Sequence, residues 1–358
     1  MRSFLSMSHV PIAMAFDRNY LCPAAVAIHS LLTCLQRSRE RITPPPPTYT
    51  IHIFSIGLTS NDLQKLTSIL EPYAHFISLD FINIEAWLEK IHNPFPPAFL
   101  ARFSQMVLVK YFLADLFPQY DKIIWTDVDV LFLDDPTLDF LTLNTSEPYY
   151  LHAVFTSEYR HALEGFWLCN LTYMRTHNWT QKVLDRIHTQ QILNEPQLIS
   201  FVWPNEIAQL PLKYCVFPAH YESRTIDYVH PNDLPFLQES LDRPIILHYC
   251  DFHGVPKPWD LPLSLKAGLW LEILLQTPFA HDFLQNWDCR QSFFIKETVY
   301  QFYFSNKYST LTLVFVIPFK FLKSYLKAVK ERLFSEGWRA LAGRMKAKLL
   351  KYIVKARK

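Results

Sequence analysis

Strand-like apolar runs alternate with helical patterns through the first 130 residues of this 358-residue chain. The predicted strands are His9–Phe16, Tyr49–Ile56, His75–Ile84 and Lys122–Thr126. Strands that alternate with helices indicate a mainly parallel α/β sheet that has helices on both faces. Ligands of such sheets bind beyond the carboxyl ends of the strands, so the residues that follow each strand are candidate site residues.

Three helices are predicted between these strands. The first begins near Pro23, which suits a first helical turn, and its apolar residues recur at spacings of three and four. Ser60 or Asn61 is expected to cap the second helix. The third helix is predicted over roughly Leu100–Phe117, and it leads into the strand that ends at Thr126.

Two acidic residues, Asp127 and Asp129, follow that last strand within the segment YDKIIWTDVDVLFLDDP. In an extended chain, residues i and i+2 project to the same face. Two carboxylates side by side repel each other unless a cation lies between them. A divalent metal held by oxygen ligands, to which a phosphate adds further oxygens, would resolve this conflict.

The cysteines and the charge distribution bear on where the protein is found. The six cysteines are far apart and form no CxxC pair, which favours a reduced, cytoplasmic protein. Residues 320–358 carry 13 Lys and Arg against two Glu, whereas the preceding residues carry 22 basic and 31 acidic side chains. The chain therefore combines an acidic body with a basic tail.

The basic tail also has a helical apolar pattern. Its apolar residues at helical spacing are Leu322, Leu326, Val329, Leu333, Leu341, Met345, Leu349 and Ile353. A basic amphipathic helix is typical of a peripheral anchor on the anionic, cytoplasmic face of a membrane. We predict a membrane-associating helical region at residues 286–358 and no nucleic-acid partner. The alternatives are docking on the acidic body and an arm that binds nucleic acid.

Several motifs, taken in order, resemble glycosyltransferase family 8. These are retaining, nucleotide-sugar-dependent transferases that include glycogenin and bacterial lipopolysaccharide glucosyl- and galactosyltransferases. The resemblance runs from about His9 to Trp259, over AFDRNY, FPQYDKIIWTDVDVLF, GFWLCNLTYMR, LPLKYCVFP and ILHYCDFHGVPKPWD. Asp-x-Asp alone is a weak signal, but its combination with the downstream His…Gly-x-x-Lys-Pro-Trp is much stronger. The resemblance implies a GT-A type nucleotide-diphospho-sugar transferase domain, placed at residues 8–285, with a mainly parallel mixed sheet.

The resemblance also implies a metal site. It assigns Asp127, Asp129 and His248 as ligands of Mn²⁺ or Mg²⁺. The family usually places this His six residues before the Lys, whereas His248 stands nine residues before Lys257. His253 is therefore an alternative ligand, and we favour His248 because it ends a strand-like run.

The donor contacts follow from the same resemblance. Gly254 and Lys257 are expected to contact the diphosphate, and Asp127 and Val128 to lie against the donor. Three residues after the first strand match the family's contacts to uracil and ribose, and a helix position where the family often has Arg carries Lys here. These residues are Asp17, Asn19, Tyr20 and Lys110.

Departures from the family pattern gather around the donor sugar. The family's Asn-(Ala/Ser)-Gly corresponds to residues 163–165, of which only Gly165 matches. The family's Asp-Gln-Asp element corresponds to EPQLIS, so that Glu195 takes the first acidic position and Pro196 replaces the Gln. Glu195 is therefore the predicted catalytic residue, and Asn194 is the alternative if the register shifts by one.

The predicted activity is a metal-dependent, retaining transfer of galactose or glucose from a UDP-sugar. The expected acceptor is a saccharide or lipid-linked oligosaccharide of a lipopolysaccharide or lipooligosaccharide core. The departures at Leu163 and Pro196 favour an alternative, a catalytically weak protein that binds nucleotide sugars. A phosphohydrolase with Asp127 as nucleophile is less favoured, because no glycine-rich phosphate loop accompanies the acidic pair.

Overall fold

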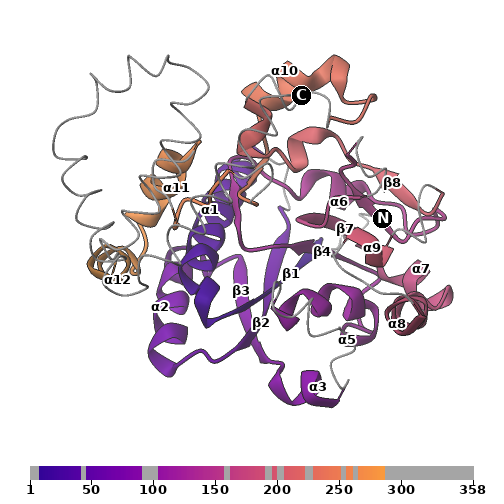
Figure 1. The fold of residues 1–358 in the computed structure, drawn as a ribbon. Helices are drawn as coiled ribbons and strands as arrows, with labels where there is room; N and C mark the ends of the chain where they lie inside the picture. The colour runs from indigo at the N-terminus through magenta and orange to yellow at the C-terminus, as the bar shows by residue number, and fades with distance from the viewer. Residues whose placement is uncertain are drawn as a thin grey trace, which may run out of the picture. The chain divides into compact units, whose positions relative to one another are not determined.

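The computed structural model describes residues 8–41, 46–90, 104–156, 162–189, 196–199, 205–221, 229–250, 255–260 and 265–286. Within them, seven strands form a sheet in the order β3-β2-β1-β4-β7-β6-β8 (Figure 1). The strands are β1 (His9–Asp17), β2 (Thr48–Ile56), β3 (Ile77–Asn83), β4 (Lys122–Thr126), β6 (Leu151–Ala153), β7 (Phe166–Asn170) and β8 (Ile207–Gln209). The four strands predicted from apolar runs are all present.

The sheet is mixed and mostly parallel, as predicted. β3, β2, β1 and β4 run parallel to one another. β7 is antiparallel to β4, so that its first residue Phe166 pairs with Thr126, the last residue of β4. β6 is antiparallel to β7 and parallel to β8. The amino end of β7 therefore meets the carboxyl end of β4, at the edge where such sheets bind ligands.

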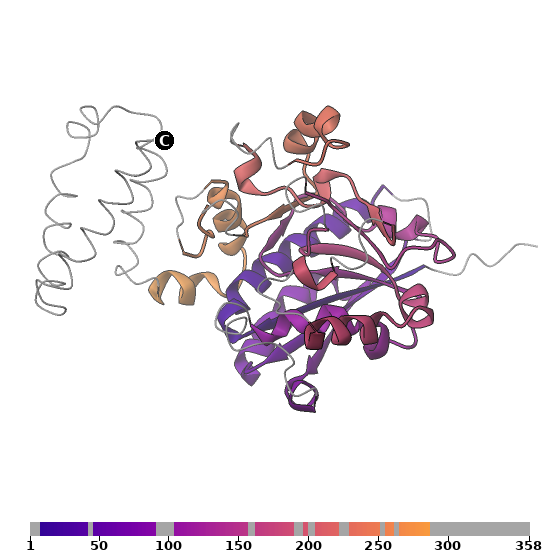
Figure 2. The same ribbon diagram turned by 45° about the vertical axis from the view of Figure 1, so that its right-hand side comes forward.

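Helices cover the sheet on both sides. In Figure 1, α1 and α2 lie to the left of the parallel strands and α5, α7 and α8 lie to the right, and Figure 2 shows α1 beside the same strands. The α-helices are α1 (Leu21–Arg39), α2 (Ser60–Leu70), α3 (Glu85–Lys90), α5 (Leu113–Leu116), α6 (Leu138–Thr142), α7 (Leu171–Thr176), α8 (Trp179–Thr189), α9 (Pro196–Ile199), α10 (Leu237–Asp242), α11 (Ala267–Leu274) and α12 (Ala280–Asn286). The 3-10 helices are η1 (Arg18–Tyr20), η2 (Glu71–Tyr73), η3 (Gln105–Phe112), η4 (Leu212–Tyr214), η5 (Pro218–Tyr221) and η7 (Leu234–Phe236).

The first helix is built as its sequence predicts. α1 begins two residues before Pro23, and the apolar face of the predicted pattern is fully buried. Its buried members include Ala24, Ile28, Leu31, Leu32 and Leu35. Burial of each larger apolar side chain contributes about 1.5–3 kcal/mol before the entropy of ordering is counted.

Two helix predictions were wrong in detail. The stretch predicted as one α-helix at Leu100–Phe117 is, in its described part, the 3-10 helix η3 followed by the single turn α5. Most of η3 is buried, so no single face carries the apolar residues, and aromatic and β-branched side chains weaken the α-helical preference. The cap of α2 is Thr59, whose side chain accepts a hydrogen bond from Asp62 N. In turn, Thr59 N donates to the carboxylate of Asp62.

A second, two-stranded sheet joins distant parts of the chain. β5 (Val130–Phe132) pairs antiparallel with β9 (Ile246–His248), so that Val130 lies opposite His248. Asp129 precedes β5 directly, and its carbonyl accepts a 2.7 Å hydrogen bond from Tyr249 N. This pairing brings an imidazole to the Asp-x-Asp segment across 119 positions of sequence.

The C-terminal predictions fall almost wholly outside the described residues. Residues 287–358, which include the predicted amphipathic tail, are not described, so the membrane-associating region and the boundary at 285 stay predictions. Among the described residues, no helix has the length and apolar character needed to cross a bilayer.

Candidate functional site

Asp127 and Asp129 lie in the turn between β4 and β5, at the carboxyl edge of the parallel strands. Strand geometry ends at Thr126, so the two carboxylates share a side because of this turn and not because of strand alternation. Asp127 N donates to Gly165 O at 2.9 Å, and Trp125 Nε1 donates to Asp127 Oδ1 at 3.0 Å. Backbone and side chain together therefore fix Asp127.

His248 faces the same turn from β9. Its Nε2 lies 3.1 Å from Asp129 Oδ1, and its Nδ1 lies 3.5 Å from Cys215 Sγ on the opposite side of the ring. The residue is 7% exposed. Gly165 makes room for the ring, because a Cβ at that position would lie 2.4 Å from Nδ1. Close packing therefore determines where the imidazole points.

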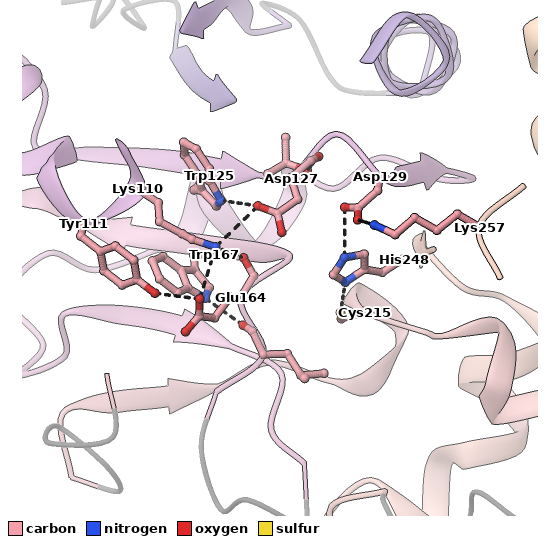
Figure 3. Close-up of polar contacts among 12 residues, drawn as sticks. Lys110, Tyr111, Trp125, Asp127, Asp129, Glu164, Trp167, Cys215, His248 and Lys257 are labelled. Atoms are coloured by element: carbon pink, nitrogen blue, oxygen red, sulfur yellow. Dashed lines mark hydrogen bonds and ion pairs between the residues drawn. The ribbon is translucent and has the colours of Figure 1, made fainter. Parts of the chain in front are cut away.

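The three predicted metal ligands converge. One ligand atom from each of Asp127, Asp129 and His248 lies within 4.8 Å of the others (Figure 3). Two carboxylates and an imidazole suit Mn²⁺ or Mg²⁺ when phosphate or water oxygens complete the coordination. The chemistry and spacing of these donors thus fit a divalent cation. Val128, between the two acids, is 4% exposed, and its contact with the donor stays a prediction.

Lys257 joins the cluster from the far side of Asp129. Its ammonium donates to Asp129 Oδ2 at 2.6 Å and to the hydroxyl of Tyr20 at 3.1 Å. Tyr20 also makes an edge contact with Trp259, at 5.9 Å between ring centroids. Tyr20, predicted to contact the base of the nucleotide, and Lys257, predicted to contact the diphosphate, therefore lie side by side at the metal cluster.

The charges of this cluster depend on one another. Burial raises the pKa of Asp129, but Lys257 and His248 outweigh burial and hold that pKa well below its usual range. Burial lowers the pKa of His248, yet Asp129 raises it well above its ordinary value. Burial also lowers the pKa of Lys257, and Asp129 again reverses the direction. Asp129 therefore favours the charged forms of both of its partners, His248 and Lys257.

Asp17 and Asn19, the other two residues predicted to bind the nucleotide, lie where β1 passes into η1. Asp17 ends β1 and caps η1, since its carboxylate accepts from Asn19 N at 2.9 Å and from Ser104 Oγ at 3.0 Å. Asn19 is exposed. Asp17 therefore directly precedes η1, Asn19 lies within η1 beside Tyr20, and the carboxylate of Asp17 is engaged within the protein.

Lys110 lies on the other side of Asp127, on η3. Its ammonium is 3.7 Å from Asp127 Oδ1 and 3.3 Å from Glu164 Oε2 (Figure 3). Tyr111 donates to the same Glu164 oxygen at 2.7 Å. Lys110 is 1% exposed and paired with carboxylates, and its contact with the donor stays a prediction.

The sequence did not identify the residues that support the cluster. Glu164, Trp125 and Cys215 contact the predicted site residues Lys110, Asp127 and His248, and Tyr111 donates to Glu164. A signal existed for Glu164, because it stands where the resembled family has Ala or Ser. No local pattern marks Cys215, since its contact with His248 depends on the pairing of distant segments.

Some predicted site residues lie outside the described residues. These are the catalytic candidates Glu195 and Asn194, the phosphate-contacting Gly254 and the alternative ligand His253. Their roles stay predictions.

Comparison with solved structures shows a shared fold. The bifunctional glycosyltransferase WbbM in its apo form gives a TM-score of 0.63 at 16% identity, over 80% of this chain and 52% of that protein. The galactosyltransferase LgtC, solved with donor and acceptor sugar analogs, gives 0.57 at 17% identity, over 75% of this chain and 96% of that protein. GlyE of Streptococcus pneumoniae TIGR4 gives 0.54 at 18% identity, over 81% of this chain and 64% of that protein. The chain thus spans about half the length of WbbM.

Comparison by sequence leads to a family. The search against curated proteins gives no match. The profile described as Glycosyl transferase family 8 matches residues 11–261, which is more than half of the chain and contains every ligand of the candidate metal site. The chain therefore belongs to glycosyltransferase family 8.

Proposed function

We propose that this protein transfers a hexose, galactose or glucose, from a UDP-sugar to a saccharide acceptor in a metal-dependent reaction that retains configuration. The observation that carries the proposal is the convergence of Asp127, Asp129 and His248 at the carboxyl edge of the parallel strands. Family membership supports the reaction class. A lone acidic pair would support much less, because exposed acidic groups often occur without a metal.

The residues of the site have separate roles in the proposed reaction. When bound, Mn²⁺ or Mg²⁺ supplies Lewis-acid charge that offsets the negative charge growing on the leaving diphosphate. Asp127, Asp129 and His248 would hold this ion. Lys257 brings a second positive charge to the same place through its contact with Asp129. Tyr20, tied to Lys257, offers its ring to the uracil.

The remaining roles extend this proposal. Asp17 and Asn19 would bind the base and ribose, Gly254 would let the backbone approach the diphosphate, and Glu195 or Asn194 would stabilise the sugar at the anomeric centre. The acceptor would be a lipopolysaccharide or lipooligosaccharide core, reached from the cytoplasmic face of a membrane to which the basic tail binds. LgtC, with its donor and acceptor sugar analogs, supports a sugar acceptor in this fold.

The test is a screen of purified protein against a panel of UDP-sugars with Mn²⁺, scored by donor hydrolysis and transfer. Asp127→Ala and Asp129→Ala should each abolish metal-dependent turnover, because each removes a ligand. Asp134→Ala removes an exposed carboxylate of the same acidic run and should keep full activity. Unchanged turnover in Asp127→Ala or Asp129→Ala would refute the ligand assignment, and donor binding without turnover in the unmodified protein would favour a binding protein.

A further inference from the structure

A buried ion pair lies beside the metal cluster and has no part in the proposed reaction. Lys110 is 1% exposed and Glu164 is 7% exposed. Lys110 Nζ lies 3.3 Å from Glu164 Oε2, and it also donates to the backbone carbonyl of Glu164 at 3.4 Å. A buried ammonium costs free energy unless a negative group compensates its charge. The carboxylate of Glu164 supplies this compensation for Lys110.

The same ammonium also reaches a metal ligand. Asp127 Oδ1 lies 3.7 Å from Lys110 Nζ, farther away than the carboxylate of Glu164. Any charge that Lys110 shares with Asp127 weakens the attraction of Asp127 for a cation, because both positive groups compete for one carboxylate. Glu164, at the shorter distance, takes the larger share of the ammonium charge.

Neighbouring groups hold Glu164 and Lys110 in this arrangement. Tyr111, fully buried, donates to Glu164 Oε2 at 2.7 Å. The ring centroids of Trp125 and Trp167 lie 5.8 and 5.3 Å from the ammonium. These two tryptophans face each other across the β4–β7 pairing. The ammonium therefore has little room to move if its partner changes.

We propose that Glu164 is a positioning residue for the metal site: it neutralises the buried ammonium of Lys110, so that Asp127 remains available to a divalent cation. This rests on the proposed function, in which Asp127 is a metal ligand. Glu164 acts through Lys110 and need not touch substrate. If Glu164 loses its charge, the ammonium stays in place with its charge uncompensated, 3.7 Å from Asp127 Oδ1, and weakens cation binding there.

The test measures Mn²⁺ binding to the full chain by the electron paramagnetic resonance of unbound Mn²⁺, with and without UDP. Glu164→Gln keeps an acceptor for Tyr111 but removes the charge, and should weaken Mn²⁺ binding about tenfold or more. The double variant K110M/E164Q removes both charges and should return Mn²⁺ affinity to within about threefold of the original. A purely structural role would not give this recovery.

The control is a similar trio away from the site. Lys182 contacts the hydroxyl of Tyr150 at 2.6 Å and Glu206 at 3.9 Å, so Glu206→Gln makes the same chemical change and should leave Mn²⁺ affinity unchanged. The proposal is overturned if E164Q binds Mn²⁺ like the original, or if K110M/E164Q binds no better than E164Q. Should E164Q not fold, K110M/E164Q decides by itself, and a loss of tenfold or more overturns the proposal.

Asp127→Ala separates this proposal from the one on which it rests. If Asp127→Ala binds Mn²⁺ like the original, the metal site itself is wrong. If Asp127→Ala loses Mn²⁺ binding while E164Q keeps it, the metal site stands and only the role of Glu164 is lost.

Discussion

Gly165→Ala tests whether the position of His248 depends on a missing side chain. A Cβ at residue 165 would lie 2.4 Å from His248 Nδ1 and 2.5 Å from Cε1, whereas ordinary contact begins at 3.4 Å. The backbone of Gly165 lies outside the left-handed region, so an alanine is not strained by the backbone itself. The substitution therefore isolates the clash with the ring.

The expected effect follows from how tightly the ring is held. The imidazole must retreat by about 1 Å, but Cys215 and Asp129 contact its two nitrogens and the residue is 7% exposed. Overpacking of this kind costs about 1–3 kcal/mol of unfolding free energy. A misplacement of about 1 Å at a reacting centre lowers turnover by about a hundredfold. Mn²⁺ affinity should fall with it, because His248 supplies one of the donors.

Urea unfolding measures the loss of stability, and a binding titration measures the loss of Mn²⁺ affinity. A double variant tests whether the clash with the imidazole of His248 causes the loss of stability. In the His248→Ala background the clash partner is gone, so adding Gly165→Ala should cost less than about 0.5 kcal/mol. Gly268→Ala is the matched control, since a Cβ there meets nothing within 4 Å. The reasoning fails if Gly165→Ala retains the stability and Mn²⁺ affinity of the original chain, or if its cost is undiminished without the imidazole.

Two more outcomes can be checked. Lys257→Met should lower kcat at saturating Mn²⁺ and donor by about a hundredfold or more, because the charge beside Asp129 is lost, and an unchanged kcat in a donor-hydrolysis assay would contradict this role. Burial raises the pKa of Asp62, but hydrogen bonds from Thr59 and the charge of nearby Arg18 outweigh burial, so the pKa is lowered overall. The ionised carboxylate therefore stabilises the fold above about pH 4, and this stability is lost as the pH falls through the folded-state pKa. Thr59→Ala should cost about 1 kcal/mol at pH 7 and less at pH 3 in urea unfolding, and an equal cost at both would show that the cap is not charge-assisted.

Much of the parallel half of the fold could be predicted from local pattern. A fully buried parallel strand reads as a continuous apolar run, and β1, β2 and β4 begin or end within one residue of their predicted bounds. α1 is buried on most sides, yet it is long enough for its larger apolar residues to recur at spacings of three and four over several turns, which predicts a helix. η3 is short and almost wholly buried, and its 3-10 geometry depends on packing that the sequence pattern does not encode.

The candidate site was predictable only as far as its residues share a motif. Asp127 and Asp129 lie two positions apart in sequence, and the family resemblance pointed to His248 at the end of a strand-like run, so the cluster could be anticipated. The contacts of Cys215 and Glu164 could not, because they depend on which distant segments pair and on the register of that pairing. Tertiary pairing of this kind leaves no local periodicity.

The short segment of Glu164 and Gly165, directly before β7, contacts both the Asp-x-Asp turn and His248. The antiparallel register that places Thr126 opposite Phe166 also sets Gly165 opposite Asp127, whose N–H it accepts at 2.9 Å. Gly165 gives His248 its space, and Glu164 beside it pairs with the ammonium that reaches Asp127. A shift of one residue in this register would move both supports together. The segment before β7 therefore controls both halves of the metal cluster without contributing a ligand to it.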